Sequence, residues 1–251
     1  GGNKLSIVRF LWIRESQDQA KSVIDAVKNS VHNVFDEYFR QEMNEIETDK
    51  RGRLGEMAEV VLSSARKEKG KAGAEVAYVT TGNLEDWEIN GGKVETAIVN
   101  PQMAGRYGLQ EWDIVMNRIN QMDRLGRCGI VRKTEENAVF GLNTVRIRVN
   151  RTKLNPVFLF VWLTHPYMKH YRKEHAKNST SFQSSLGKQV LMEQPVPAVA
   201  VGKQNRFAQE MENYFSYVKN GEEIIQTLER LRQTNYNKIK ALFETRQIRK
   251  R

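Results

Sequence analysis

Two stretches, one near each end of the chain, carry apolar residues at alternating steps of four and three, which is the spacing of a coiled-coil seam. In the first stretch, Gln17 to Phe39, these positions are Ala20, Ile24, Val27, Val31, Val34 and Tyr38. In the second they are Met211, Tyr214, Val218, Gly221, Ile225 and Leu228, continuing after a slip in phase at Leu231, Ile239, Leu242 and Phe243. The pattern predicts a long helix at each end of the chain.

Two such helices bury their seams most simply by packing against each other in antiparallel orientation, as a stalk. Each seam could instead pack on another protein or on a second copy of this chain, and the sequence does not separate these alternatives. We assign the apolar run Ile7 to Ile13 (IVRFLWI) to the first helix. Gly221 is a weak point of the second helix, where a kink or short break can occur, because Gly costs about 1 kcal/mol relative to Ala.

The middle of the chain, residues 52–203, has a different pattern. Short apolar runs separated by Gly-Asn, Gly-Gly and Glu-Asn turns predict strands at 77–79, 114–116, 129–131 and 145–149. Two stretches look helical, Leu54 to Leu62 and Asn155 to about Lys177. The predicted fold class is therefore α+β, with a mixed domain carried on a stalk of two long antiparallel helices.

The charge of the chain is concentrated in this middle part. The net charge is +10, of which residues 51–203 contribute +8, residues 204–251 contribute +4 and residues 1–50 contribute −2. A positive field on one domain suits a polyanion such as DNA or RNA. Cys128 is the single cysteine, which fits a reducing, cytoplasmic location. The longest apolar run, Val157 to Leu163, is too short for a bilayer, so we expect no membrane association.

Motifs for catalysis or metal binding are absent from the sequence. No glycine-rich turn for S-adenosylmethionine and no Walker lysine loop occurs. His165, His170 and His175 are five residues apart, and each such step on a helix turns the face by about 140°, so they cannot share one ion. We therefore predict neither a catalytic residue nor a metal site.

Polar side chains gather where the strand at 114–116 ends. Residues 111–131 read EWDIVMNRINQMDRLGRCGIV, an apolar run followed by amides and arginines. Arg presents two parallel donors to guanine, Asn and Gln present a donor and an acceptor to adenine, and Lys neutralises phosphate. The segment is either a solvated loop between strands or a loop that contacts base edges.

The order of several motifs resembles the specificity subunit of type I restriction-modification systems. Residues 54–60 (LGEMAEV) are similar to the LGExAEV opening of its target recognition domains, and residues 78–92 to its YV, GNI and G elements. Residues 111–127 resemble its GDILxxR strand and GK continuation, with Trp112 where Gly is usual. Residues 184–197 are similar to its closing GxxQ and IPLPP elements, and residues 204–208 to EQxxFA.

The resemblance implies one target recognition domain at 52–203, a conserved spacer helix at 3–47 and a distal conserved helix at 204–251. It implies a non-catalytic chain that reads half of a bipartite double-stranded DNA target in the major groove and docks methyltransferase subunits, in host defence against foreign DNA. The methyltransferase partner would bind S-adenosylmethionine, and a motor-nuclease restriction subunit would bind ATP and Mg²⁺; this chain would bind no cofactor. At 251 residues it looks like the C-terminal half of a member, or a half-length member that dimerises.

We expect DNA contacts from a first loop, from residues beside it, from a second loop and from a basic run that holds phosphates. In that order these are Arg118, Asn120, Gln121, Arg124 and Arg127; Thr80, Thr81 and Asn83; Ser181, Gln183 and Lys188; and Lys169, Arg172, Lys173 and Lys177. We expect the helix–helix or partner interface at Ala20, Ile24, Val27, Val31, Val34, Tyr38, Met211, Val218, Ile225 and Leu228. The alternatives are another nucleic-acid-binding coiled-coil protein, or a nuclease or methyltransferase fragment.

Overall fold

The chain forms two compact units, seen in a computed structural model that describes residues 2–46, 51–69, 72–133, 137–178, 180 and 182–248. The helical unit comprises Gly1–Val31 and Glu212–Arg251, and the α+β unit comprises His32–Met211. Helices α1 (Gly2–Tyr38) and α8 (Val201–Ile248) contribute residues to both units. Within the described residues, no helix combines the length and the apolar character needed to cross a membrane.

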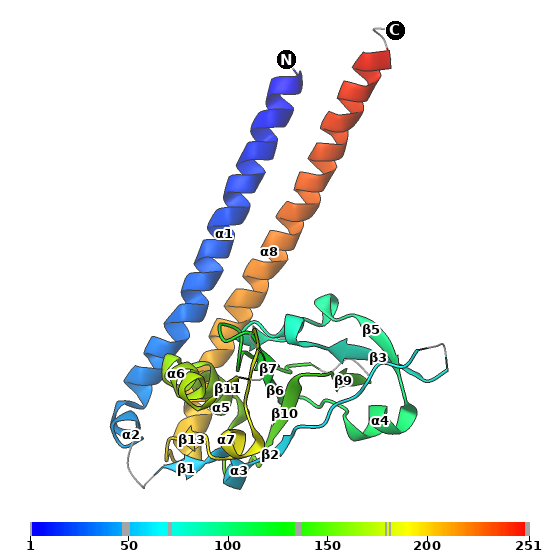
Figure 1. Cartoon of the computed structure of the whole chain (residues 1–251). Coiled ribbons are helices and arrows are strands. Elements are labelled where there is room, and N and C mark those ends of the chain that lie inside the picture. The colour runs from blue at the N-terminus through cyan, green and yellow to red at the C-terminus, as the bar shows by residue number, and fades with distance from the viewer. Residues whose placement is uncertain are drawn as a thin grey trace. The chain divides into compact units, whose positions relative to one another are not determined.

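Polar contacts join the two helices of the helical unit in antiparallel order. Gln17 donates to Glu229 Oε1 at 2.8 Å and accepts from Arg232 at 3.1 Å, and the Lys28 ammonium lies 3.3 Å from Glu222. Because residue numbers rise on α1 as they fall on α8, the start of α1 and the end of α8 lie at the same end of the pair (Figure 1). The predicted antiparallel pairing is confirmed.

The predicted seam lies largely between these helices. A Cβ atom on Gly221 would stand 2.9 Å from the Ile24 side chain, so the glycine admits close packing, and α8 passes through it without the break that could have occurred there. In the helical unit the seam residues that are buried are Ile24, Val31 and Val218, and those that are half-buried are Ala20, Val27, Ile225 and Leu228. In the α+β unit, Met211 is buried and Val34 and Tyr38 are half-buried.

The α+β unit is built on a five-stranded sheet in the order β2-β10-β6-β8-β4. Its strands are β2 (Ala58–Val61), β10 (Thr144–Val149), β6 (Ile114–Asn117), β8 (Cys128–Ile130) and β4 (Trp87–Glu88). All pairs are antiparallel except β4 with β8. A second sheet has the order β5-β3-β9, from β5 (Thr96–Val99), β3 (Ala74–Val79) and β9 (Ala138–Phe140). The predicted α+β fold class and the strands at 77–79, 114–116, 129–131 and 145–149 are confirmed.

Shorter elements complete the unit. A two-stranded sheet pairs β1 (Gly52–Arg53) with β13 (Pro195–Val196), and a three-stranded sheet joins β11 (Lys177–Asn178), β12 (Ser184–Ser185) and β7 (Ile119–Asn120). The remaining helices are α2 (Arg40–Asn44), α3 (Leu54–Met57), α4 (Pro101–Arg106), α5 (Pro156–Thr164), α6 (Pro166–His175) and α7 (Lys188–Met192), with 3₁₀ turns η1 (Thr81–Asn83) and η2 (Gly91–Lys93).

Two predicted helices differ from the structure. The helix expected at Leu54 to Leu62 ends at Met57, and Ala58–Val61 form β2, because this segment pairs with the distant strand β10. The helix expected from Asn155 to Lys177 is two helices, since Pro166 begins α6 and the preceding His165 adopts an extended conformation. Asn155 caps α5 by accepting from the amides of Val157 and Phe158.

Aromatic packing around α5 forms a core of the α+β unit. All nine residues of α5 are buried. The Phe35 ring contacts Phe158, Trp162 and Phe207 with centroids 5.4 to 5.8 Å apart. Such pairs contribute about 0.5–1.5 kcal/mol each beyond the burial of their area. The cluster fixes the helix that lies beside β8, the strand that follows the polar segment.

Candidate nucleic-acid interface

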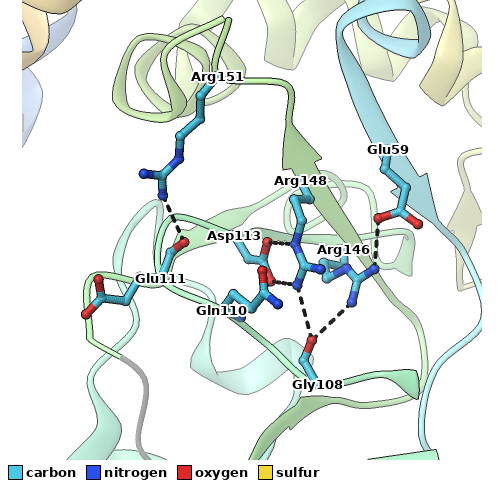
Figure 2. A network of polar contacts seen from close by, with 8 residues as sticks. All are labelled: Glu59, Gly108, Gln110, Glu111, Asp113, Arg146, Arg148 and Arg151. Atoms are coloured by element: carbon cyan, nitrogen blue, oxygen red, sulfur yellow. Dashed lines mark hydrogen bonds and ion pairs between the residues drawn. The ribbon is translucent and has the colours of Figure 1, made fainter. Parts of the chain in front are cut away.

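An ion pair with a buried carboxylate holds the start of β6, the strand that leads into the candidate loop. Asp113, 1% exposed, accepts two bonds of 2.7 Å from the guanidinium of Arg148 on β10 (Figure 2). This bidentate pairing raises the pKa of Arg148, chiefly through the hydrogen bond to Asp113. Arg146 donates to Gly108 O at 3.0 Å and to Glu59 at 3.0 Å. These two arginines of β10 therefore stabilise the scaffold and are not candidates for DNA contact.

Asn117, at the end of β6, organises the loop that follows. Its side chain is fully buried and donates to the Arg124 carbonyl at 3.2 Å, while its backbone amide donates to Arg127 O at 2.8 Å. The Gly126 amide donates back to Asn117 O at 3.0 Å. These bonds close residues 117–127 into a compact loop. The buried side chain of Asn117 therefore stabilises the loop from its inner side.

Gly126 is required by both backbone conformation and packing. Its φ is +73°, which L residues rarely adopt, and a Cβ there would lie 2.2 Å from Nε of Arg172. Arg172 is 1% exposed and donates to Leu163 O at 2.6 Å and to Gln194 Oε1 at 3.2 Å. The buried guanidinium thus fills the space beneath the loop.

The three-stranded sheet β11-β12-β7 brings the two predicted contact loops together. Ser184 pairs with Asn120 and Ser185 with Ile119, and the Leu186 amide donates to Arg118 O at 2.9 Å. Because β12 and β7 are antiparallel, the residues before Ser184 and those after Asn120 leave this sheet at the same end. Loops separated by about sixty residues of sequence form one surface, which we call the reading surface. It comprises residues 118–127 and, of the second loop, the described residues 177, 178, 180 and 182–188.

The predicted contact residues differ in how far they are exposed. On the reading surface the exposed side chains are Gln121, Arg124, Lys177, Gln183 and Lys188, and the half-buried ones are Arg118, Asn120 and Arg127. Asn120 uses its carbonyl oxygen to accept from the Gln121 amide at 2.8 Å. The Arg124 side chain is 60% exposed and lies 3.9 Å from Asp123, a weak surface ion pair. Ser181 lies outside the described residues.

A recess of about 530 Å³ adjoins Arg118. Asn143, Asn100 and Arg66 contribute to its lining. Asn143 has a φ of +65°, and its carbonyl accepts from the Arg118 amide at 2.8 Å. Arg118 therefore borders both this recess and the reading surface. Arg66, Asn100 and Asn143 were not predicted to lie near Arg118, because they belong to three separate segments that only the fold brings together.

Thr80 and Asn83 are engaged within the 3₁₀ turn η1. The Thr80 amide donates to Asn83 Oδ1 at 2.8 Å, the Gly82 amide donates to Thr80 Oγ1 at 3.3 Å, and Asn83 Nδ2 donates to Lys93 O at 3.1 Å. This capping box gives both side chains a structural role. Thr81 is half-buried within the same turn.

The basic residues of α6 that were predicted to hold phosphates lie in different environments. Lys169 pairs with Asp86 at 2.7 Å, and Asp86 also accepts from the Cys128 amide at 2.9 Å. Lys173 is exposed. The prediction that Arg172 holds a phosphate is wrong for this structure, because its guanidinium is buried and bonded inside the protein. Amphipathic spacing alone cannot reveal that this one cation faces inward.

The histidines and the cysteine of the described chain do not gather at one exposed site. Burial lowers the pKa of His165, which lies 3.1 Å from Asp36, whereas the imidazole of His170 is exposed beside Glu174. Burial raises the pKa of the Cys128 thiol to about 12. No group of three or more His, Cys, Asp or Glu residues in the described part of the chain could hold a metal ion.

Comparison with known proteins found a curated relative by sequence and similar solved structures. No protein-family model matches the chain. A curated protein of Methanocaldococcus jannaschii, provisionally named as the specificity subunit of the type I restriction enzyme MjaX, is 24% identical over 217 residues. The match covers 84% of this chain and 50% of the relative.

The S subunit of a type I restriction-modification system from M. genitalium has a similar structure, with a TM-score of 0.52 and 14% identity. The alignment covers 95% of this chain and 58% of that subunit. The HsdS subunit from Thermoanaerobacter tengcongensis gives a TM-score of 0.49 and 12% identity, covering 94% of this chain and 56% of that subunit.

The chain thus spans half the length of the curated relative and little more than half of the solved subunits. The resemblance to specificity subunits that the motifs predicted is confirmed by the curated relative. The likeness to the M. genitalium subunit independently confirms the shared fold.

Proposed function

We propose that this chain, as a relative of type I restriction-modification specificity subunits, supplies DNA sequence recognition to such a complex and reads one half of a bipartite target. The observation that carries the proposal is the reading surface, where strand pairing between β7 and β12 joins two amide- and cation-rich loops. This surface belongs to an α+β unit in a chain that is similar to a specificity subunit.

The side chains of the reading surface have the chemistry that duplex DNA requires. Arg118, Arg124 and Arg127 can donate two bonds to guanine, and Gln121 and Gln183 can pair with adenine in the major groove. Lys173, Lys177 and Lys188 can neutralise phosphates and so position the duplex without reading its sequence. Lys169 is the weaker candidate for that role, since Asp86 already balances its charge.

The helical unit offers a surface for partner subunits. On α8 the exposed apolar residues Tyr217, Ile224 and Leu231 recur every seven residues, which places them on one face. Leu231, which was predicted to continue the seam, is instead 49% exposed. Trp12 on α1 is also exposed, at 62%. We assign these faces to methyltransferase subunits and, in a half-length protein, to a second recognition half.

The proposal gives this chain no catalytic role of its own. S-adenosylmethionine would be bound by the methyltransferase partner, and ATP and Mg²⁺ by the restriction partner. The chain would contribute the choice of site and the spacing between two half-targets. A cytoplasmic location, where the DNA substrate lies, follows from this function.

A selection from randomised duplex DNA tests the proposal, using the full chain alone and with a co-expressed methyltransferase partner. We expect enrichment of one sequence and binding that weakens steeply with salt. Arg124→Ala should weaken binding of the enriched duplex about five-fold or more, whereas Lys173→Ala should weaken all sequences alike and lower the salt slope by about 1.

Arg40→Ala is the matched control, since Arg40 is an exposed arginine on α2 outside the reading surface. Its substitution should leave affinity unchanged. Equal affinity for single-stranded RNA would favour a general nucleic-acid-binding protein instead. Cleavage or methylation of DNA by the purified chain alone, given Mg²⁺ or S-adenosylmethionine, would favour the enzyme alternative.

A further inference from the structure

Phe182 has an apolar side chain that is exposed to solvent on the reading surface. Its exposed fraction is 82%, the largest among the exposed large hydrophobic residues of the described chain, where the others range from 36% to 62%. A phenylalanine in water forgoes the burial that favours its side chain in folded proteins. Single exposed apolar residues are common, so the position of Phe182 between the two loops, and not its exposure alone, makes it a candidate contact.

The backbone at Phe182 is held by a turn. Thr180 Oγ1 accepts from the amides of Phe182 and Gln183 at 3.3 and 3.0 Å, and the Thr180 amide donates to Gln183 O at 3.1 Å. Two residues later Ser184 begins β12 and pairs with Asn120. Phe182 is thus held through the bonds to Thr180, at the end of the sheet where the loop after Asn120 also emerges.

The charge around the tip selects the kind of partner. Residues 176–192 contain Lys177 and Lys188 and no Asp or Glu. Arg124 and Gln121 are exposed on the neighbouring loop. On these two loops the cations outnumber the one acidic residue, Asp123. A cationic surface that also carries an exposed aromatic ring suits an anionic polymer that offers a small apolar group. Duplex DNA meets this description, because the C5-methyl group of thymine is the apolar feature of its major groove.

We propose that Phe182 contacts a thymine methyl group in the half-target and makes recognition depend on that thymine. The inference rests on the proposed function and names one determinant of its specificity. Phe has no hydrogen-bonding group, so it can distinguish bases in the groove only through shape and apolar contact. The polar residues beside it would read the flanking base pairs.

Replacement of each thymine of the selected duplex by deoxyuridine, which lacks only the methyl group, tests the inference. With the native chain we expect one position, or two adjacent ones, at which the change weakens binding about four-fold, the equivalent of one buried CH₂ group. Phe182→Ala should bind the thymine duplex about four-fold or more weakly and should lose nothing further on the change to deoxyuridine at that position.

Two further variants separate contact from folding. Phe182→Leu should retain part of the thymine preference, and Tyr236→Ala, which removes another exposed aromatic ring, on α8, should leave it unchanged. Because Phe182 is exposed, the melting temperature of Phe182→Ala should equal that of the native chain. A lower melting temperature, or a thymine preference that survives in Phe182→Ala, would overturn the inference.

The outcomes also separate this inference from the proposed function. If the native chain selects one duplex sequence but no thymine depends on Phe182, only the inference fails. If binding falls equally for thymine and deoxyuridine in Phe182→Ala, the ring acts by stacking and the thymine contact is refuted. If the native chain shows no sequence preference for duplex DNA, the proposed function fails as well.

Discussion

Asn117 and Arg172 have the side chains that commonly contact bases and phosphates, yet both are buried and bonded to the backbone of their own unit. Their neighbours Gln121 and Lys173 are exposed. Composition and spacing could predict that this region is polar and cationic. They could not predict which polar groups face inward, because that depends on packing between Gly126 and α6.

Gly126→Ala tests this packing at a single residue. The substitution places a methyl group against Nε of Arg172 at a φ of +73°, so we expect a loss of about 2 kcal/mol in the free energy of unfolding. Gly105→Ala is the control, since nothing lies within 4 Å of its Cβ position, and should be neutral or slightly stabilising. Urea denaturation measures both, and equal effects would contradict the account of Gly126.

His32 makes the stability of the α+β unit depend on pH. Burial, aided by the neighbouring charge of His165, lowers the pKa of His32 to about 4 from its ordinary value of 6.5. Lys169 lowers the pKa further, while Asp86 and Asp36 oppose the shift. Since the folded state disfavours the protonated ring, stability is full above pH 6.5 and falls as the pH drops toward 4.

His32→Gln should therefore show a smaller loss of melting temperature between pH 7 and pH 4.5 than the native chain. Glutamine can keep a polar contact with Thr164, which lies 3.1 Å from the His32 ring. Asn33→Gln, at the exposed neighbouring position, serves as the control and should keep the native pH profile. An unchanged profile in His32→Gln would show that other groups cause the loss.

Elements defined by local periodicity were predictable, and those defined by distant pairing were not. The seams at 20–38 and 211–228 predicted both long helices because helical spacing is a local signal. Residues 58–61 look helical in sequence but form β2 through pairing with β10. Strands β7, β11 and β12 have two residues each, too short for any pattern. The sequence alone therefore could not predict that the two loops form one surface.

Ile24→Asp tests the antiparallel helix pair. Ile24 is 5% exposed and packs against Gly221, so a carboxylate there should destabilise the pair by about 2–4 kcal/mol. Amide hydrogen exchange in residues 212–231 should then become faster. Val23→Asp, at the adjacent position with 48% exposure, should change exchange little. Similar exchange in the two variants would argue against the seam.

For the whole molecule, the α+β unit is proposed to choose the DNA sequence and the helical unit to hold the partner subunits. This division agrees with the uneven charge, which gives residues 51–203 a net charge of +8. It also agrees with the seven-residue repeat of exposed apolar residues on α8. The target sequence itself could not be predicted, because base preference depends on how side chains are placed against the bases when DNA is bound.

The most direct test of DNA recognition is to map methylated adenines in DNA from cells that express this chain together with its proposed methyltransferase partner. We predict methylation confined to one sequence motif, lost without the chain and weakened or altered by Arg124→Ala. Methylation of the same adenines in the absence of the chain, or methylation without sequence preference in its presence, would contradict the account.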